Sequence, residues 1–551
     1  MPSYNLLDEK WIPVLTVSGH VESVGIRELF QQADSLVDLA CELPTQSFAL
    51  YRLLLSILYR ATDGLYGGDG ASAERQWREL WTDGLPSDEI DEYLLEWHDR
   101  FYLLGGDVPF HQVADLRTAK DAVSGLEKII ADVPNGSQFF TTRAGEALER
   151  IPCSEAAIWL VHAQAFDPSG IRSGVIGDSL QKGGKGYPIG PSWAGQIGGV
   201  LVVGDTIAQT LMLNFVPYDY LGVEHDEAIW ERDQQPTSVR GDFTFEKGER
   251  PIPGPARLYT WPSRRVRLVG SLDGITGVIL SQGDKLAEHN MHEREPMSGW
   301  RHSLPQSRKL KTKVYMARRH DATQSFWRTL PAMLPASTGE SGRLGKGQDP
   351  HLPAATLRFL ANESIYELVG SPMLRVRAVG VTYGSMEAVI DEVYSDEVAV
   401  SAEVLGDRKE EVTRILEQAV RRADEVSYRL GVLARDVAQA GGDRSEEPGA
   451  AQAQGAQATF YARLDGFAPA WMTSFVRSES LELHLAEWDD HLRSLAYELG
   501  GELVTSAPPS ARQGRLVSVG GGTRLVTLPS AEQSFFSALH RILPRVRKVR
   551  T

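Results

Sequence analysis

Cysteine and long apolar runs are both scarce in this chain. Among 551 residues only Cys41 and Cys153 are cysteines, too few for a disulfide framework. No run of about 18 apolar residues occurs, so we expect no membrane span. The first residues, MPSYNLLDEKW, lack the basic-then-apolar order of a secretory signal. These absences together predict a cytoplasmic protein with no membrane partner.

Motifs for nucleotide, metal and hydrolytic chemistry are also missing. A phosphate-binding loop needs Gly, four residues and then Gly-Lys-Ser/Thr, but the Gly-Lys pairs at 184–185 and 345–346 are each followed by glycine. His289 and His292 have no neighbouring cysteine or further histidine that would complete a zinc site. No Gly-x-Ser-x-Gly elbow is present. The sequence therefore predicts no enzyme, no cofactor and no metal.

Acidic residues outnumber basic ones: the chain has 57 Lys and Arg and 73 Asp and Glu, which gives a net charge of −16. That balance argues against a general nucleic-acid binder. Basic residues nevertheless gather in three stretches, 257–267, 308–319 and 541–550. A local basic patch on an acidic protein can follow one phosphate path. The alternative is that each stretch is a solvated face.

Strand and helix patterns alternate up to about residue 395 and become helical beyond it. Apolar residues recur every three or four positions through 412–437, which predicts a long amphipathic helix. Further helices are expected at about 459–475, 480–499 and 530–550, the last with Ser530 and Gln533 in capping-box spacing. The low-complexity segment 441–458 predicts a flexible loop. We thus expect an α+β fold, with a mixed domain over 1–395 and a four-helix bundle over 396–551.

The most unusual stretch is FDPSGIRSGVIG, residues 166–177, which opens a Gly-rich passage reaching about residue 199. Small residues at this density leave backbone N–H groups open to a polyanion or a base edge. The residues alone leave three alternatives: an ordinary surface loop, a phosphate- or nucleotide-binding enzyme, or part of a purely structural subunit. Residues 183–199 are interpreted as scaffold.

Several motifs, taken in order along the chain, resemble the CasA family, the large subunit of the type I-E CRISPR Cascade complex. They are NLLDEKWIPV, FYLLGGDVPF, LEKIIADVPNGSQFFTTR, QAFDPSGIRSG, LYTWP and SGWRHSLPQS. The resemblance implies a non-catalytic subunit that recognises a protospacer-adjacent motif in double-stranded DNA and helps guide RNA pair with it. Implied partners are the other Cascade subunits, the 5′ handle of the guide RNA, the target duplex and a helicase-nuclease.

The resemblance also implies site residues. The family's glycine loop, which meets the DNA minor groove, aligns with Asp167, Pro168, Ser169, Gly170 and Arg172, where Pro168 and Ser169 replace glycines. Its lysine finger has no exact match, and the candidates are Lys285, Asn290, His292 and Arg294.

The family's glutamine wedge falls in a segment of this chain that holds no glutamine. The candidates there are Thr382, Tyr383, Gly384, Ser385 and Met386, of which Tyr383 or Met386 would insert between base pairs. The loop that holds the guide handle and a neighbouring subunit aligns with Asn135, Gln138, Phe139, Phe140 and Arg143.

Overall fold

The computed structural model describes residues 3–65, 73–133, 143, 149–233, 242–243, 253–337, 351–477, 480–519 and 522–544. The chain is a mixture of helices and strands and divides into two compact units. Unit 1 comprises Met1–Phe326, Ala332–Gly370 and Arg375–Val398, and unit 2 comprises Trp327–Pro331, Ser371–Leu374 and Ala399–Thr551. Two short segments from the first part of the sequence thus belong to the second unit.

Unit 1 is built around one nearly fully buried helix, α2 (Pro44–Ala61). All of its residues except Pro44 and Arg60 are buried, which is typical of a helix enclosed by other elements. It packs against α4, α6, α7 and α9. The other helices of the unit are α1 (Ile26–Gln32), α3 (Ala73–Asp83), α4 (Ser87–Glu96), α6 (Cys153–Phe166), α7 (Ile207–Asn214), α8 (Tyr218–Leu221), α9 (Pro255–Tyr259), α10 (Leu304–Leu310), α11 (Ala355–Leu360) and α12 (Glu363–Val369).

The strands of unit 1 form small sheets rather than one large sheet. Their orders are β3-β2-β4, β17-β16-β8 and β14-β13-β15, with the pairs β1-β5, β6-β7, β10-β11 and β12-β9. The strands are β1 (Tyr4–Asn5), β2 (Ile12–Thr16), β3 (Val21–Val24), β4 (Leu36–Leu39), β5 (Tyr102–Leu104), β6 (Arg172–Ser173), β7 (Lys185–Gly186), β8 (Gly199–Val203), β9 (Asp242–Phe243), β10 (Arg264–Ser271), β11 (Gly274–Gln282), β12 (Lys285–Leu286), β13 (Trp300–His302), β14 (Tyr315–Ala317), β15 (His351–Leu352), β16 (Met373–Tyr383) and β17 (Ile390–Ser401).

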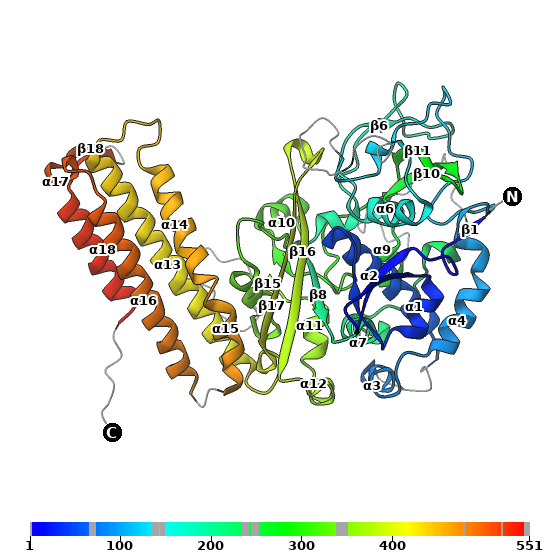
Figure 1. Cartoon of the computed structure of the whole chain (residues 1–551), viewed down its shortest axis with the longest axis horizontal. Coiled ribbons are helices and arrows are strands. Elements are labelled where there is room, and N and C mark those ends of the chain that lie inside the picture. Colours follow the sequence, from blue (N-terminus) through cyan, green and yellow to red (C-terminus); the bar gives the residue numbers. More distant parts are fainter. Residues whose placement is uncertain are drawn as a thin grey trace. The chain divides into compact units, whose positions relative to one another are not determined.

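Two of these pairs position the candidate site. β16 and β17 run side by side as a long hairpin whose tip is a 3-10 turn, Ser385–Glu387 (Figure 1). β10 and β11 pair antiparallel around a turn at Leu272 and Asp273, and β11 also contacts β6. β6 begins two residues after Gly170. The contact between β11 and β6 therefore packs the β10-β11 hairpin against the Gly-rich stretch.

Unit 2 is organised around the 33-residue helix α13 (Lys409–Gly441), which contacts α14, α16 and α18. The apolar positions predicted over 412–437 form its buried face. Trp488 of α16 is enclosed, and its indole N–H donates to the carbonyl oxygen of Ala419 over 3.0 Å. The other elements are α14 (Ala450–Leu464), α15 (Ala468–Thr473), α16 (Leu481–Thr505), α17 (Ser510–Gln513), β18 (Arg515–Val519), β19 (Gly522–Val526) and α18 (Leu528–Ile542).

The segment 441–458, expected as a flexible loop, is helical over its second half because α14 begins at Ala450. Only the connection before it is non-helical, and the Asp443 carboxylate closes it by accepting the backbone N–H groups of Ser445 and Gly449. Alanine and glutamine are good helix formers, so the low complexity concealed a helix. The expectation of a loop across the whole segment is wrong.

The start of the last helix also differs from the prediction. α18 begins at Leu528, and its N-cap is Thr527, whose hydroxyl accepts the backbone N–H of Ser530. Ser530 returns the interaction by accepting the N–H of Thr527, so the reciprocal pair lies three residues earlier than expected.

Within the described ranges no helix combines the length and apolar character needed to cross a membrane.

Candidate nucleic-acid interface

The Gly-rich stretch begins at a buried carboxylate. α6 ends at Phe166, and the next residue, Asp167, is only 6% exposed. Its Oδ2 accepts hydrogen bonds from Arg264 Nε and Arg172 Nη2, both at 2.5 Å. Arg264 Nη2 also donates to the carbonyl oxygens of Pro168, at 3.0 Å, and Gly190, at 2.9 Å. Asp167 therefore holds the loop in shape through its two arginine partners.

The next residues set which groups of the loop are exposed. Gly170 has φ +148°, a conformation that side chains disfavour, and a Cβ placed there would meet open space. Its carbonyl oxygen accepts a hydrogen bond from Gln282 Nε2 over 2.8 Å. Ser169 is buried, whereas Ile171 is 56% exposed. Pro168 and Gly170 are partly exposed and Ser173 is exposed, so Ile171 is the large apolar side chain that the loop presents.

The two wedge candidates, Tyr383 and Met386, have opposite orientations at the tip of the β16-β17 hairpin. Met386 is 88% exposed, and both Met386 and Glu387 have positive φ, +55° and +56°. Tyr383 turns inward, and its hydroxyl donates to the carbonyl oxygen of Phe166 over 2.8 Å. Burial raises the pKa of this phenol, so it stays protonated. Thr382 and Ser385 are exposed, and Gly384 packs closely against Asp391.

Hydrogen bonds join the loop and the hairpin tip. The backbone N–H of Ser169 donates to the carbonyl oxygen of Glu387 over 2.8 Å. The carboxylate of Glu387 accepts Arg319 Nη1 at 2.6 Å, and Arg319 Nε donates to the carbonyl oxygen of Gln196. Hydrogen bonds therefore join two segments more than 200 positions apart in sequence, one carrying the exposed Ile171 and the other the exposed Met386.

The finger candidates have different surroundings. Asn290 lies at φ +57°, and its side chain bonds the backbone at Lys313 and Tyr315. Arg294 Nη1 donates to the carbonyl oxygens of Leu221 and Gly222, both at 2.7 Å. His292 packs at 4.8 Å from the Tyr315 ring, and burial lowers its pKa.

Lys285, at the start of β12, is the exposed member of the finger set. It lies three residues after Gln282, the residue that holds Gly170. Of the handle-loop residues, Asn135, Gln138, Phe139 and Phe140 lie outside the described residues. Arg143 is described, and its guanidinium pairs with Asp132, Glu42 and Glu155.

The chain matches the sequence model of the family described as CRISPR-associated protein Cse1 over residues 5–499. It belongs to the Cse1 family. The match spans most of the chain and confirms the resemblance to the CasA family, because a curated relative from Thermus thermophilus carries both names, CasA/Cse1. That relative is 29% identical to the present Cse1-family chain over 514 residues, covering 90% of this chain and 92% of the relative.

Solved structures resemble this Cse1-family chain over nearly its full length. The crystal structure of Thermobifida fusca Cse1 is 36% identical and superposes with a TM-score of 0.86, covering 98% of both chains. A chain from a structure described as a CRISPR RNA-guided surveillance complex is 18% identical, with a TM-score of 0.71 over 98% of this chain and 100% of that chain. At that identity the likeness shows the fold alone.

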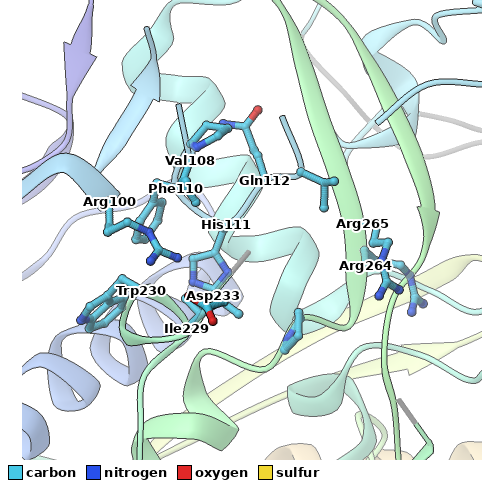
Figure 2. A pocket seen from close by; sticks show the side chains of 13 residues that line it. Arg100, Val108, Phe110, His111, Gln112, Ile229, Trp230, Asp233, Arg264 and Arg265 are labelled. Atoms are coloured by element: carbon cyan, nitrogen blue, oxygen red, sulfur yellow. The ribbon is translucent and has the colours of Figure 1, made fainter. Parts of the chain in front are cut away.

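A separate cavity of about 60 Å³ in this Cse1-family chain is lined in part by Arg264, which also bonds Asp167 of the loop (Figure 2). His111 lies between Trp230 on one side and Arg264 and Arg265 on the other. The His111 backbone has φ +52°, and burial lowers the pKa of its ring to about 3. Ligand pockets for small molecules usually measure about 300–1,000 Å³, so this cavity has no room for a nucleotide.

The sequence did not indicate several residues that shape the loop and the hairpin tip of this Cse1-family chain. Arg264 and Arg265 belong to the first basic stretch, for which a solvated face was the alternative, yet Arg264 is 1% exposed and both pair with buried aspartates. Their position at the start of an alternating strand, RRVRLVG, was the available signal. Ile171, Gln282 and Glu387 carried no signal in sequence, because their roles depend on contacts across the fold.

Proposed function

We propose that this chain is the non-catalytic large subunit of an RNA-guided antiviral DNA surveillance complex. In this proposal it recognises the protospacer-adjacent motif in double-stranded DNA and helps to open the duplex so that the guide RNA can pair. The single observation that carries it is the hydrogen bond between Ser169 N–H and the Glu387 carbonyl oxygen, which holds a reading loop beside an exposed apolar tip.

The loop suits reading from the minor groove. A duplex can approach Gly170 closely because no Cβ blocks its backbone, and Ile171 offers an apolar contact to the groove wall. The minor groove presents a degenerate set of acceptors, so such a loop would tolerate several related motifs. Lys285, which is exposed three residues after Gln282, would supply a cationic finger.

The hairpin tip suits a wedge that works by apolar insertion. Side chains such as methionine unstack base steps in other minor-groove binders, at an energetic cost of a few kcal/mol per step. Met386 is exposed and fixed by its turn, so it can enter a step without a further ordering of the chain. Thr382 and Ser385 would contact the flanking backbone.

The remaining assignments follow from the same proposal. The sequence segment with Asn135, Gln138, Phe139, Phe140 and Arg143 would hold the 5′ handle of the guide RNA and a neighbouring Cascade subunit. α13, α14, α16 and α18 would form a four-helix bundle that offers the helicase-nuclease a docking surface. The complex would act in the cytoplasm on invading DNA, without a cofactor.

An electrophoretic assay tests the proposal. Guide-loaded complex is assembled with and without this chain and titrated against a duplex carrying the motif and against one with the motif scrambled. We expect that omission of the chain abolishes the preference for the motif. Equal affinity for both duplexes, with and without the chain, would refute the proposed function.

A point variant locates the reading surface. Ile171→Glu places a negative charge on the exposed loop, and Val21→Glu makes the same change on an exposed strand of unit 1 away from the loop. We expect about a tenfold or greater loss of affinity for the motif duplex with Ile171→Glu, or at least about 1.4 kcal/mol, and none with Val21→Glu. Equal losses would assign the effect to overall charge.

A further inference from the structure

A tight basic turn, Lys182-Gly183-Gly184-Lys185, stands next to the loop in a segment that sequence reasoning treated as scaffold. Lys182 and Lys185 exchange backbone hydrogen bonds of 3.0 and 3.2 Å, which closes a two-residue hairpin. Gly183 and Gly184 have φ +59° and +71°, the pattern of a type I′ turn, which glycine favours at both central positions. Both lysines are exposed, so the turn presents two positive charges on a rigid backbone.

The turn borders a groove of about 320 Å³ that continues to the loop. Lys128, Arg172 and Lys185 contribute the charged side chains of its lining, and none of the lining residues that the structure describes is acidic. Ile171 lines the same groove. On a chain of net charge −16, this basic groove is a local exception and favours an anionic occupant.

Arg172 supplies a second, independent sign of an anionic ligand. Its side chain is only 10% exposed, and Nη2 is occupied by Asp167 Oδ2 and the carbonyl oxygen of Pro168. Its Nε is buried and has no hydrogen-bond partner among the described residues. A buried N–H without a partner is unfavourable, and a bound acceptor would relieve that cost.

We propose that the Lys182–Lys185 turn and the basic groove bind backbone phosphates of the target duplex beside the motif. This inference rests on the proposed function, because it takes the loop to be at the minor groove. The minor groove of DNA is about 6 Å wide and is bounded by phosphates on both sides. A duplex in contact with Gly170 and Ile171 therefore brings a phosphate run alongside the loop, where Ile171 and Arg172 already form a wall of the basic groove.

The test replaces Lys182 and Lys185 together with glutamine and measures duplex affinity of the guide-loaded complex across 50–200 mM salt. The matched control is Arg414→Gln with Arg421→Gln, two exposed cations on α13 that lie outside the groove and outside the three basic stretches of the sequence. Each lost phosphate contact should reduce the slope of log affinity against log salt by about 0.9, so the turn variant should lose about 1.8. The ratio of affinities for motif and scrambled duplexes should stay unchanged, because phosphates carry no sequence.

Each outcome has one meaning. A slope equal to that of the control overturns the groove assignment, while the wild-type preference for the motif still supports the proposed function. A turn variant that retains less guide RNA at an unchanged duplex slope also overturns it and assigns the groove to RNA. If the wild-type chain confers no preference for the motif, the proposed function fails first, and a reduced slope would then mean non-specific DNA binding.

Discussion

The backbone N–H of Ser169 donates to the carbonyl oxygen of Glu387 over 2.8 Å, and this bond ties the Gly-rich loop to the tip of the β16-β17 hairpin. The bond uses no side chain, so it does not depend on which residues occupy the two positions. It does require Glu387 to keep its positive φ. The loop and the tip of the hairpin are thus joined directly through their main chains.

Replacing Met386 with glycine should separate stability from function. Met386 has φ +55°, which is unfavourable by about 1–2 kcal/mol for a residue with a side chain, so Met386→Gly should raise the free energy of unfolding by up to about 1 kcal/mol. It also removes the proposed wedge, and strand opening at saturating duplex should fall. Denaturant unfolding and the fluorescence of a base analogue next to the motif report the two effects.

Lys311→Gly is the control for that experiment, since Lys311 also has positive φ, +56°, at the end of α10. The Lys311→Gly variant should show a similar rise in the free energy of unfolding and no change in strand opening of the duplex. Opening that is unchanged by Met386→Gly would exclude Met386 as the wedge.

Removing the Asp167 carboxylate should destabilise unit 1 strongly. Asp167→Ala leaves the Arg264 and Arg172 guanidinium groups buried without their shared anion, and breaking a buried ion pair from one side typically costs about 3–5 kcal/mol. Asp205→Ala breaks an exposed pair with Arg375 and should cost less than about 1 kcal/mol. Urea unfolding of both variants checks this, and comparable losses would show that the Asp167 pairs contribute no more than surface contacts.

His162 should make the protein sensitive to mild acid. Burial lowers its pKa from 6.5 to about 4, so between these pH values the unfolded chain binds a proton that the folded chain does not. The free energy of unfolding should therefore fall as the pH decreases through this window, by about 2 kcal/mol from pH 7 to pH 5. His162→Gln should reduce that loss, and unfolding curves at the two pH values measure it.

The exposed His20 provides the comparison, because His20→Gln should leave the acid sensitivity unchanged. His111 and His320, whose pKa values burial also lowers, should retain part of the effect in every variant. If His162→Gln loses as much stability as the wild type between pH 7 and pH 5, the His162 ring does not drive the change.

Local patterns in the sequence were enough to predict the elements whose stability is itself local or periodic. The apolar spacing of 412–437 predicted α13, because side-chain periodicity acts between near neighbours. The order of motifs also led to the Cse1 family. The same local logic failed at 450–458, where composition hid a helix that packs against α13.

Only the tertiary structure decided how the candidate site is assembled. It buried Asp167 and Arg264 against each other, turned Tyr383 inward and Met386 outward, and placed the Lys182–Lys185 turn beside Arg172. Burial, pairing and direction in these cases come from contacts between residues up to about two hundred positions apart. The sequence by itself determined which chemical groups the chain carries, and the packing of distant segments decided which of them face solvent.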